Sequence, residues 1–250
     1  NHKYEKAIEF YTLYIKQRGI RKNDPWLATS YKHIGIIFND KGEYKKALEY
    51  YFKAHEIFKS VYGENNDYFA ISCSHIGLAY DCEGEHNKAL EYHFKAFEIQ
   101  KTIHGENDAY VATIETNIGL VYFNMREYNK SLEYYLRALE KRKSLYEENH
   151  PDIATSYNNI GLVYDNLREY NKALDYYSKA LDIRKTIHGE NHPLVALAYT
   201  NSAISYRNLG EKEKAMEYHL KALDIRKSLF KENHADVAES YDHIGFLYDT

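Results

Sequence analysis

The sequence has few of the residues that interrupt helices or cross-link chains. It contains three prolines and two cysteines among 250 residues. So few prolines suit a nearly all-helical chain, because proline inside a helix removes a hydrogen bond and clashes with the preceding turn. Cys73 and Cys82 lie nine residues apart, on opposite sides of one predicted helix, so they cannot bridge each other. These counts argue against a disulfide-stapled secreted scaffold and predict a reducing, cytoplasmic location.

Long apolar runs and a strong charge of one sign are also missing. Lys and Arg number 33 and Asp and Glu 37, which gives a net charge of −4. That balance does not produce the dominant basic surface of a nucleic-acid binder. No apolar run approaches the length of a membrane-spanning helix, and no charged-then-apolar signal opens the chain. We therefore expect neither a nucleic acid nor a membrane as partner.

What the sequence does contain is a stretch of 42 residues, Asn149–Glu190, which recurs along the chain in drifted copies. Steps of 42 residues connect a series of small residues: Gly35, Gly77, Gly119, Gly161, Ala203 and Gly245. The same step connects a series of tyrosines: Tyr50, Tyr92, Tyr134, Tyr176 and Tyr218. Recurrence in several columns identifies a tandem repeat. The register changes only at the front, where Ala7 matches Ala47 after 40 residues.

Each copy predicts two helices joined by a tight turn. In the copy quoted above we expect them over residues 152–167 and 169–188, with Pro151 at the entry of the first helix and Gly189 just past the second. Two copies carry Glu147 and Lys231 in place of that last glycine, so those helix ends need a different cap. Glycine inside a helix costs about 1 kcal/mol relative to alanine. Its recurrence at the Gly161 column therefore indicates that two helices approach closely there.

The small and aromatic columns carry a family resemblance. In the central copy they are Gly161, Ala173, Ala180, Tyr157, Tyr164 and Tyr177. This pattern resembles the tetratricopeptide repeat, whose usual period is about 34 residues. The longer form seen here, with its N-N-I-G and A-L-D-I-R-K blocks, is similar to the repeats of kinesin light chains. The resemblance implies an all-α solenoid of antiparallel helix pairs stacked into a right-handed superhelix.

The repeat register predicts a single array over residues 1–250. Residues 1–18 are expected to be the second helix of a truncated repeat, and residues 234–250 the first helix of another. The expected full repeats are 24–65, 66–107, 108–149, 150–191 and 192–233. We expect about twelve helices in a fragment of a longer array, because neither end carries the polar capping helix of a solenoid.

A narrow polar stripe along the first helices is the candidate binding surface. Asn159 and Asn166 are seven residues apart and nearly in line, with Leu162 between them. The resemblance implies that this side lines a concave groove, where carboxamides can hydrogen-bond the backbone of an extended peptide. The candidate peptide-binding residues are His75, Asn117, Leu120, Asn124, Asn159, Leu162, Asn166, Asn201, Ile204 and Asn208. The alternative is that the amides bridge neighbouring repeats or face water.

Charge in the stripe is sparse. Lys32 and Arg207 are its main cations, and its anions include Asp81 and Asp165. Kinesin light chains accept acidic cargo motifs, but this chain lacks a basic groove, which favours a neutral or mildly basic peptide. A repeated basic pair, such as Arg226 with Lys227, fits either an acidic partner or favourable charge near a helix C-terminus.

No motif in the sequence indicates catalysis. The thirteen histidines are not at metal-ligand spacing, and neither a nucleophile–base constellation nor a glycine-rich phosphate loop is present. We therefore expect no enzyme activity, cofactor or metal. The leading hypothesis is a protein-interaction scaffold that holds a partner's peptide segment in its groove. The second is a sensor or autoinhibitory arm of a larger multidomain signalling protein, with another segment of its own chain as partner.

Overall fold

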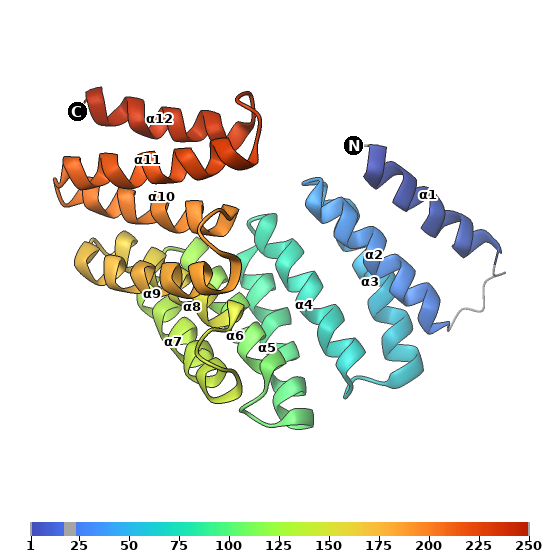
Figure 1. Cartoon of the computed structure of the whole chain (residues 1–250). Coiled ribbons are helices and arrows are strands. Elements are labelled where there is room, and N and C mark those ends of the chain that lie inside the picture. The colour runs from blue at the N-terminus through green and yellow to red at the C-terminus, as the bar shows by residue number, and fades with distance from the viewer. Residues whose placement is uncertain (1, 18–23, 250) are drawn as a thin grey trace. The chain divides into compact units, whose positions relative to one another are not determined.

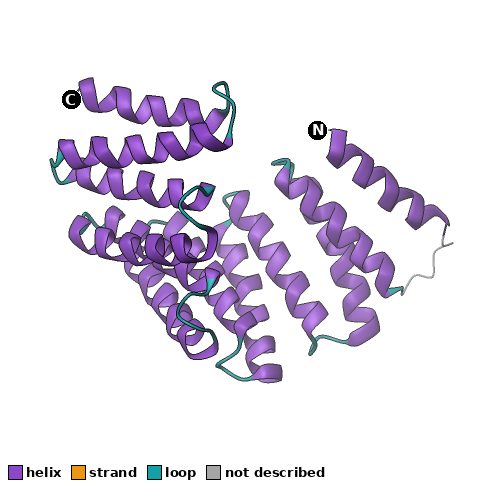
Figure 2. Ribbon diagram, in the orientation of Figure 1, coloured by secondary structure: helices purple, strands orange, loops and turns teal. Residues whose placement is uncertain are grey.

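The computed structural model describes residues 2–17 and 24–249, and every regular element within them is an α-helix (Figure 2). The helices are α1 His2–Gln17, α2 Pro25–Asp40, α3 Tyr44–Tyr62, α4 Asp67–Cys82, α5 His86–His104, α6 Ala109–Asn124, α7 Tyr128–Leu145, α8 Pro151–Asn166, α9 Tyr170–His188, α10 Pro193–Asn208, α11 Lys212–Leu229 and α12 Ala235–Asp249. The first connector, expected to be two residues shorter than the others, includes residues 18–23, which lie outside the described residues.

The chain forms two compact units, Asn1–Glu127 and Tyr128–Thr250, called unit 1 and unit 2 below. Figure 1 draws α1–α6 from blue to green and α7–α12 from yellow-green to red. In unit 1, α2 packs on α3 and α4 on α5; in unit 2, α8 packs on α9 and α10 on α11. Each second helix also packs on the next first helix, as α3 does on α4 and α9 on α10. The predicted all-α solenoid of helix pairs is confirmed, while the single array over residues 1–250 stays a prediction.

The recurring glycine inside the first helix makes room for a ring. A Cβ atom added at Gly161 of α8 would lie 2.5 Å from Cε1 of Tyr177 on α9. In unit 1, Gly35 meets the ring of Tyr51 in the same way, and Gly77 meets the ring of His93. Any larger residue would overlap these buried rings. The close packing that the sequence predicts from its mid-helix glycines is therefore present.

The first helices begin at one column of capping residues. Asp24, Asn66 and Asp108 accept a backbone N–H of the first turn in unit 1. In unit 2 the same column carries His150 and His192, whose Nδ1 atoms accept the N–H two residues ahead at 3.2 Å. Side-chain acceptors at this position satisfy a donor that has no partner inside the helix. The repeated histidines thus have a structural role that spacing alone did not reveal.

The helix ends follow the sequence, and the two second helices without the glycine, α7 and α11, have 18 residues instead of the 19 of α9. Gly63, Gly105 and Gly189 follow α3, α5 and α9 with positive φ, as predicted for helix-terminating glycines. Where the glycine is missing, α11 is one residue shorter than α9 and ends at Leu229, followed by Phe230 in extended conformation. The tight turn between paired helices needs a positive φ as well, and Arg168 adopts it at 61°.

Candidate peptide-binding surface

In unit 1 the predicted stripe lies on α4 and α6. His75 is half-buried, with Nδ1 2.8 Å from the carbonyl oxygen of Ile71 and its ring 5.3 Å from that of Tyr51. Burial lowers the pKa of His75, so the ring stays neutral at neutral pH. The Nδ2 atom of Asn124 donates to Asp81 at 2.8 Å, which joins α6 to α4. Two of the predicted stripe residues in unit 1 therefore already have partners within the unit.

The other two predicted residues of unit 1 are less engaged. Asn117 is half-buried and has no hydrogen bond to any described residue. Leu120, one turn further along α6, keeps 38% of its surface exposed. Together they place an amide and an aliphatic side chain next to each other on the surface of α6.

In unit 2 the stripe lies on α8 and α10. Asn159 and Leu162 are half-buried on α8, and no described residue hydrogen-bonds the amide of Asn159. Asn166 is exposed, and each of its amide atoms makes one hydrogen bond: Nδ2 donates to the carbonyl oxygen of Leu162 at 2.8 Å, and Oδ1 accepts the hydroxyl of Tyr128 at 3.1 Å. Asn166 therefore offers a partner less hydrogen-bonding capacity than Asn159 does.

On α10, the stripe includes amide atoms that have a hydrogen-bond partner and amide atoms that have none among the described residues. Nδ2 of Asn201 donates to Oδ1 of Asn158 on α8 at 3.0 Å, which leaves Oδ1 of Asn201 without a described donor. Ile204 is half-buried beside it. Asn208 is exposed, and its Oδ1 lies 3.5 Å from an Nη atom of Arg207. The amide nitrogen of Asn201 thus bridges neighbouring repeats, as the alternative expects. Contact between its amide oxygen and a peptide stays a prediction.

Two acidic residues of the stripe, Asp81 and Asp165, are hydrogen-bonded to other residues of their own unit. Asp165 accepts the hydroxyl of Tyr177 at 3.0 Å and that of Ser205 at 2.8 Å. Burial raises the pKa of Asp165, and these two hydrogen bonds oppose the rise. Asp81 is 6% exposed and contacts His86 at 2.7 Å in addition to Asn124. Neither carboxylate is a surface charge for a partner, which the sequence pattern could not distinguish.

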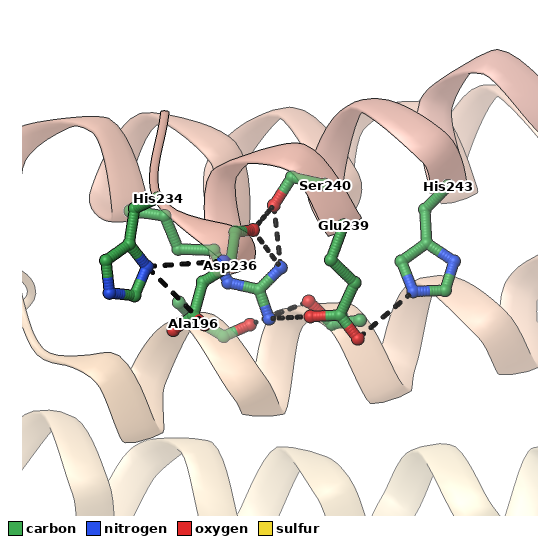
Figure 3. A network of polar contacts seen from close by, with 8 residues as sticks. Ala196, His234, Asp236, Glu239, Ser240 and His243 are labelled. Carbon is green, nitrogen blue, oxygen red and sulfur yellow. Dashed lines mark hydrogen bonds and ion pairs between the residues drawn. The ribbon is translucent and has the colours of Figure 1, made fainter. Parts of the chain in front are cut away.

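The repeated arginines near the ends of the second helices are buried in unit 2. Arg226 of α11 donates to the carbonyl oxygen of Asp236 at 3.3 Å and to the hydroxyl of Ser240 at 2.6 Å. It also pairs with Glu239 at 3.2 Å. Figure 3 shows these three α12 residues with their dashed contacts. Arg226 is 6% exposed, so it joins consecutive repeats instead of presenting charge to an acidic partner.

Arg142 and Arg184 make the same kind of link. Arg142 donates to Ser156 of α8 at 2.6 Å. Arg184 donates to the carbonyl oxygen of Leu194 at 3.1 Å and lies 3.4 Å from Oδ1 of Asn158. Hydrogen bonds from a charged donor to the first turn of the next helix are stronger than neutral ones. These contacts attach α8, α10 and α12 to the second helices that precede them.

Across 2–17 and 24–249, no group of three or more His, Cys, Asp or Glu side chains is placed to hold a metal ion. No helix among the same residues is long and apolar enough to cross a bilayer. The stripe combines amide and aliphatic side chains, which are suited to hydrogen bonding and apolar contact.

Solved structures share this architecture. BtubC (BKLC) from P. vanneervenii is 24% identical, with 91% of this chain and 90% of that chain covered and a TM-score of 0.74. A putative kinesin light chain with nearly identical TPR-like repeats from Podosopora anserina is 14% identical, covering 83% and 99%, with a TM-score of 0.69. A Signal Transduction ATPase with Numerous Domains from Pyrococcus horikoshii, which has a tetratricopeptide repeat sensor, is 22% identical, covering 89% and 32%, with a TM-score of 0.71. At these identities the similarity shows the fold alone.

The sequence comparison gives the family. No curated protein matches the sequence. A family model described as tetratricopeptide repeat matches residues 26–102, 110–186 and 166–228, which together are more than half of the chain. The predicted resemblance is confirmed, including the similarity of the fold to kinesin-light-chain-like repeats. The chain belongs to the tetratricopeptide repeat family.

Proposed function

We propose that this chain binds an extended segment of a partner protein along the stripe of α8 and α10. Tetratricopeptide repeats indicate a protein-interaction scaffold, and the fold is typically non-catalytic. The observation that carries the proposal is the pairing of unused amide groups with half-buried aliphatic side chains. Asn159 with Leu162, and Asn201 with Ile204, place this pair on consecutive first helices.

The chemistry of the pair suits a peptide backbone. Each peptide unit offers one N–H donor and one carbonyl acceptor. Asn159 has both amide donors and its acceptor unused by described residues, and Asn201 has an unused acceptor. An extended peptide alternates its side chains, so Leu162 and Ile204 can contact apolar groups between the hydrogen bonds. This proposal requires no metal or cofactor.

The helices that present the pair are held in place before a ligand arrives. The Asn201–Asn158 and Ser205–Asp165 hydrogen bonds join α10 to α8 directly. Arg184 of α9 adds a link to both helices. Preorganisation of this kind lowers the entropy lost on binding. The unused amides therefore sit on a rigid support.

The charged side chains that remain accessible on the stripe indicate what net charge a bound peptide should have. Because Asp81 and Asp165 are hydrogen-bonded within their own units, the stripe has fewer free anions than the sequence suggests. Arg207 makes no ion pair with any described residue and lies 5.1 Å from the ring of Phe246. The proposed ligand is a peptide without strong net charge. Free thiols at Cys73 and Cys82 are compatible with the proposed cytoplasmic setting.

The sensor-arm hypothesis uses the same surface with a ligand from its own protein. The similarity to the ATPase that has a tetratricopeptide repeat sensor is at 22% identity and shows the fold alone. Among the described residues of each unit, no contact favours a partner segment of the same chain over one of another protein. We therefore keep the partner-protein proposal as the first choice.

A displayed peptide library tests the proposal. Peptides selected on the purified chain are measured by fluorescence anisotropy against the wild type, the Asn159→Ala/Asn201→Ala variant and the control Asn171→Ala. Asn171 is an exposed amide on α9, outside the stripe. Losing two hydrogen bonds of about 1 kcal/mol each should weaken binding by roughly tenfold to thirtyfold in the double variant only. Equal binding to all three folded proteins would refute the proposal.

A further inference from the structure

Arg184 of α9 is a buried cation that forms no ion pair with any described residue. It is 5% exposed. Its Nη1 atom donates to the carbonyl oxygen of Leu194 at 3.1 Å and lies 3.4 Å from Oδ1 of Asn158, and both acceptors are neutral. Burial lowers the pKa of Arg184, but a guanidinium keeps its charge at neutral pH. A buried charge without an opposite charge beside it costs free energy, so Arg184 favours the arrival of an anion.

Arg226 of α11 occupies the same column 42 residues later, and there the charge is neutralised. Besides its hydrogen bonds to Asp236 and Ser240, Arg226 pairs through Nη2 with Oε2 of Glu239 at 3.2 Å. Figure 3 shows Glu239 on α12, one position before Ser240. The Glu239 side chain is 56% exposed, so its carboxylate meets the buried guanidinium from the solvent side.

The helix that follows Arg184 lacks the residues that serve Arg226. Glu239 corresponds to Leu197 of α10, and Ser240 corresponds to Ala198. Leu197 is 38% exposed and Ala198 is buried. Helix α10 contains no Asp or Glu at any position. No side chain of α10 can therefore do for Arg184 what Glu239 does one repeat later, and the corresponding place lies beside an exposed leucine.

The acidic residues closest to Arg184 in the sequence do not neutralise it either. Asp182 precedes it by two residues, and residues at that spacing do not face each other on a helix. Glu190, in the loop after α9, pairs with Lys185 at 3.1 Å. Burial and then neighbouring cations, Arg184 among them, lower the pKa of His192, which caps α10. The local field is therefore positive and suits a negatively charged group.

We propose that unit 2 binds a single anionic group, a carboxylate or a phosphate, at the guanidinium of Arg184 beside Leu197. A guanidinium carries five N–H donors in a planar arrangement that matches two oxygens of either group. The Arg226–Glu239 pair supports the proposal, because the same repeat geometry accommodates a carboxylate there. The inference does not depend on peptide binding in the stripe, since it makes no use of the Asn159 amide.

Two variants at one position test the site without removing Arg184. Leu197→Glu copies Glu239 and supplies the anion from within the chain, while Leu197→Gln has the same size and no charge. Leu197 is partly exposed, so both variants should fold, and circular dichroism melts check this. The unfolding equilibrium constant of Leu197→Glu should be lower than that of Leu197→Gln by roughly threefold to tenfold. Equal constants would overturn the proposal.

Urea unfolding at pH 7 in increasing sodium phosphate measures binding directly, with sodium chloride of equal ionic strength as the reference. An anion that binds only the folded chain raises the unfolding midpoint. The midpoints of the wild type and Leu197→Gln should rise, half-maximally at about 1 to 10 mM as for a single charge-assisted contact, and that of Leu197→Glu should follow the chloride reference.

A second arm replaces phosphate with the blocked peptide acetyl-Gly-Glu-Gly-amide and its Gln counterpart, which distinguishes an acidic side chain from a phosphate as the source of the anion. A rise with either anion that is absent in Leu197→Glu supports the site. A wild type that follows the reference with both anions would overturn it. A Leu197→Glu protein that responds as strongly as the wild type would overturn it too.

Discussion

Alanine in place of Gly161 should destabilise the protein, although alanine is the better helix former. The side chain would begin 2.5 Å from Cε1 and 2.7 Å from Cδ1 of Tyr177, well inside van der Waals contact. The ring cannot rotate away freely, because Tyr177 is fully buried and its hydroxyl donates to Asp165 at 3.0 Å. The methyl group must therefore displace either the ring or the two helices.

The magnitude follows from three contributions. Replacing glycine by alanine inside a helix stabilises by about 1 kcal/mol. Overpacking a buried site costs about 1 to 3 kcal/mol. Loss of the Tyr177–Asp165 hydrogen bond as the ring moves adds about 1 kcal/mol. The expected net effect is a loss of about 1 to 3 kcal/mol in the free energy of unfolding.

Gly245 provides a control in the same column. It lies inside α12 with open space around its Cα, so Gly245→Ala should stabilise by up to about 1 kcal/mol. Both variants are measured by urea unfolding followed by far-UV circular dichroism. A Gly161→Ala protein at least as stable as the wild type would refute the packing argument. A second check combines Gly161→Ala with Tyr177→His, which copies the natural Ala203 and His219 pair and should recover part of the loss.

Three further predictions concern a turn and two buried polar residues. Arg168 has φ 61°, so Arg168→Gly should stabilise by about 1 kcal/mol in urea unfolding, while Gly210→Ala, at φ 83°, should destabilise. Gln100 is 1% exposed, and neither of its amide atoms is bonded to a described residue, so Gln100→Leu should raise the free energy of unfolding by roughly 1 to 2 kcal/mol, and a fall would contradict this. Burial lowers the pKa of His93 to about 4, below the ordinary value near 6.5 of the unfolded chain. Stability from neutral His93 should therefore be complete above pH 6.5 and decline by up to about 3 kcal/mol as pH falls to about 4. His93→Phe should flatten that decline in unfolding experiments at pH 7 and 4.5, and an unchanged decline would assign the acid sensitivity to other groups.

The helix pairs and their closest contacts could be predicted from the sequence because repetition multiplies a weak signal. One mid-helix glycine is ambiguous, but the same glycine at Gly35, Gly77 and Gly161 indicates a common steric cause. The 100° helical step then places Tyr177 on the facing side of the partner helix. Helix boundaries differ by at most one residue in the central copy, where Pro151 and Gly189 mark the ends.

The sequence pattern does not predict which side chains hydrogen-bond to one another. Periodicity places Asn201 on the stripe, but its bond to Asn158 depends on how α10 sits on α8. Asp165 looks like a surface anion by position and is instead held by Tyr177 and Ser205. Histidine spacing alone does not predict that His150 and His192 cap α8 and α10. A clue was available, because the same column carries Asp24 and Asn66, which are common N-cap residues.

Variation inside a column distinguishes packing from binding more clearly than position does. The column that ends the second helices contains Phe58 and Gln100 in unit 1, then arginines in unit 2. The arginines have acceptors on the next helix, whereas Gln100 is buried without one, so this column tolerates change only at a cost in stability. The column of Asn159 changes between histidine and asparagine, and Asn159 itself has no hydrogen bond to a described residue. A half-buried polar residue that has no hydrogen bond to a described residue contributes little to the stability of its own unit. Asn159 is therefore the position where a substitution should change binding without changing stability.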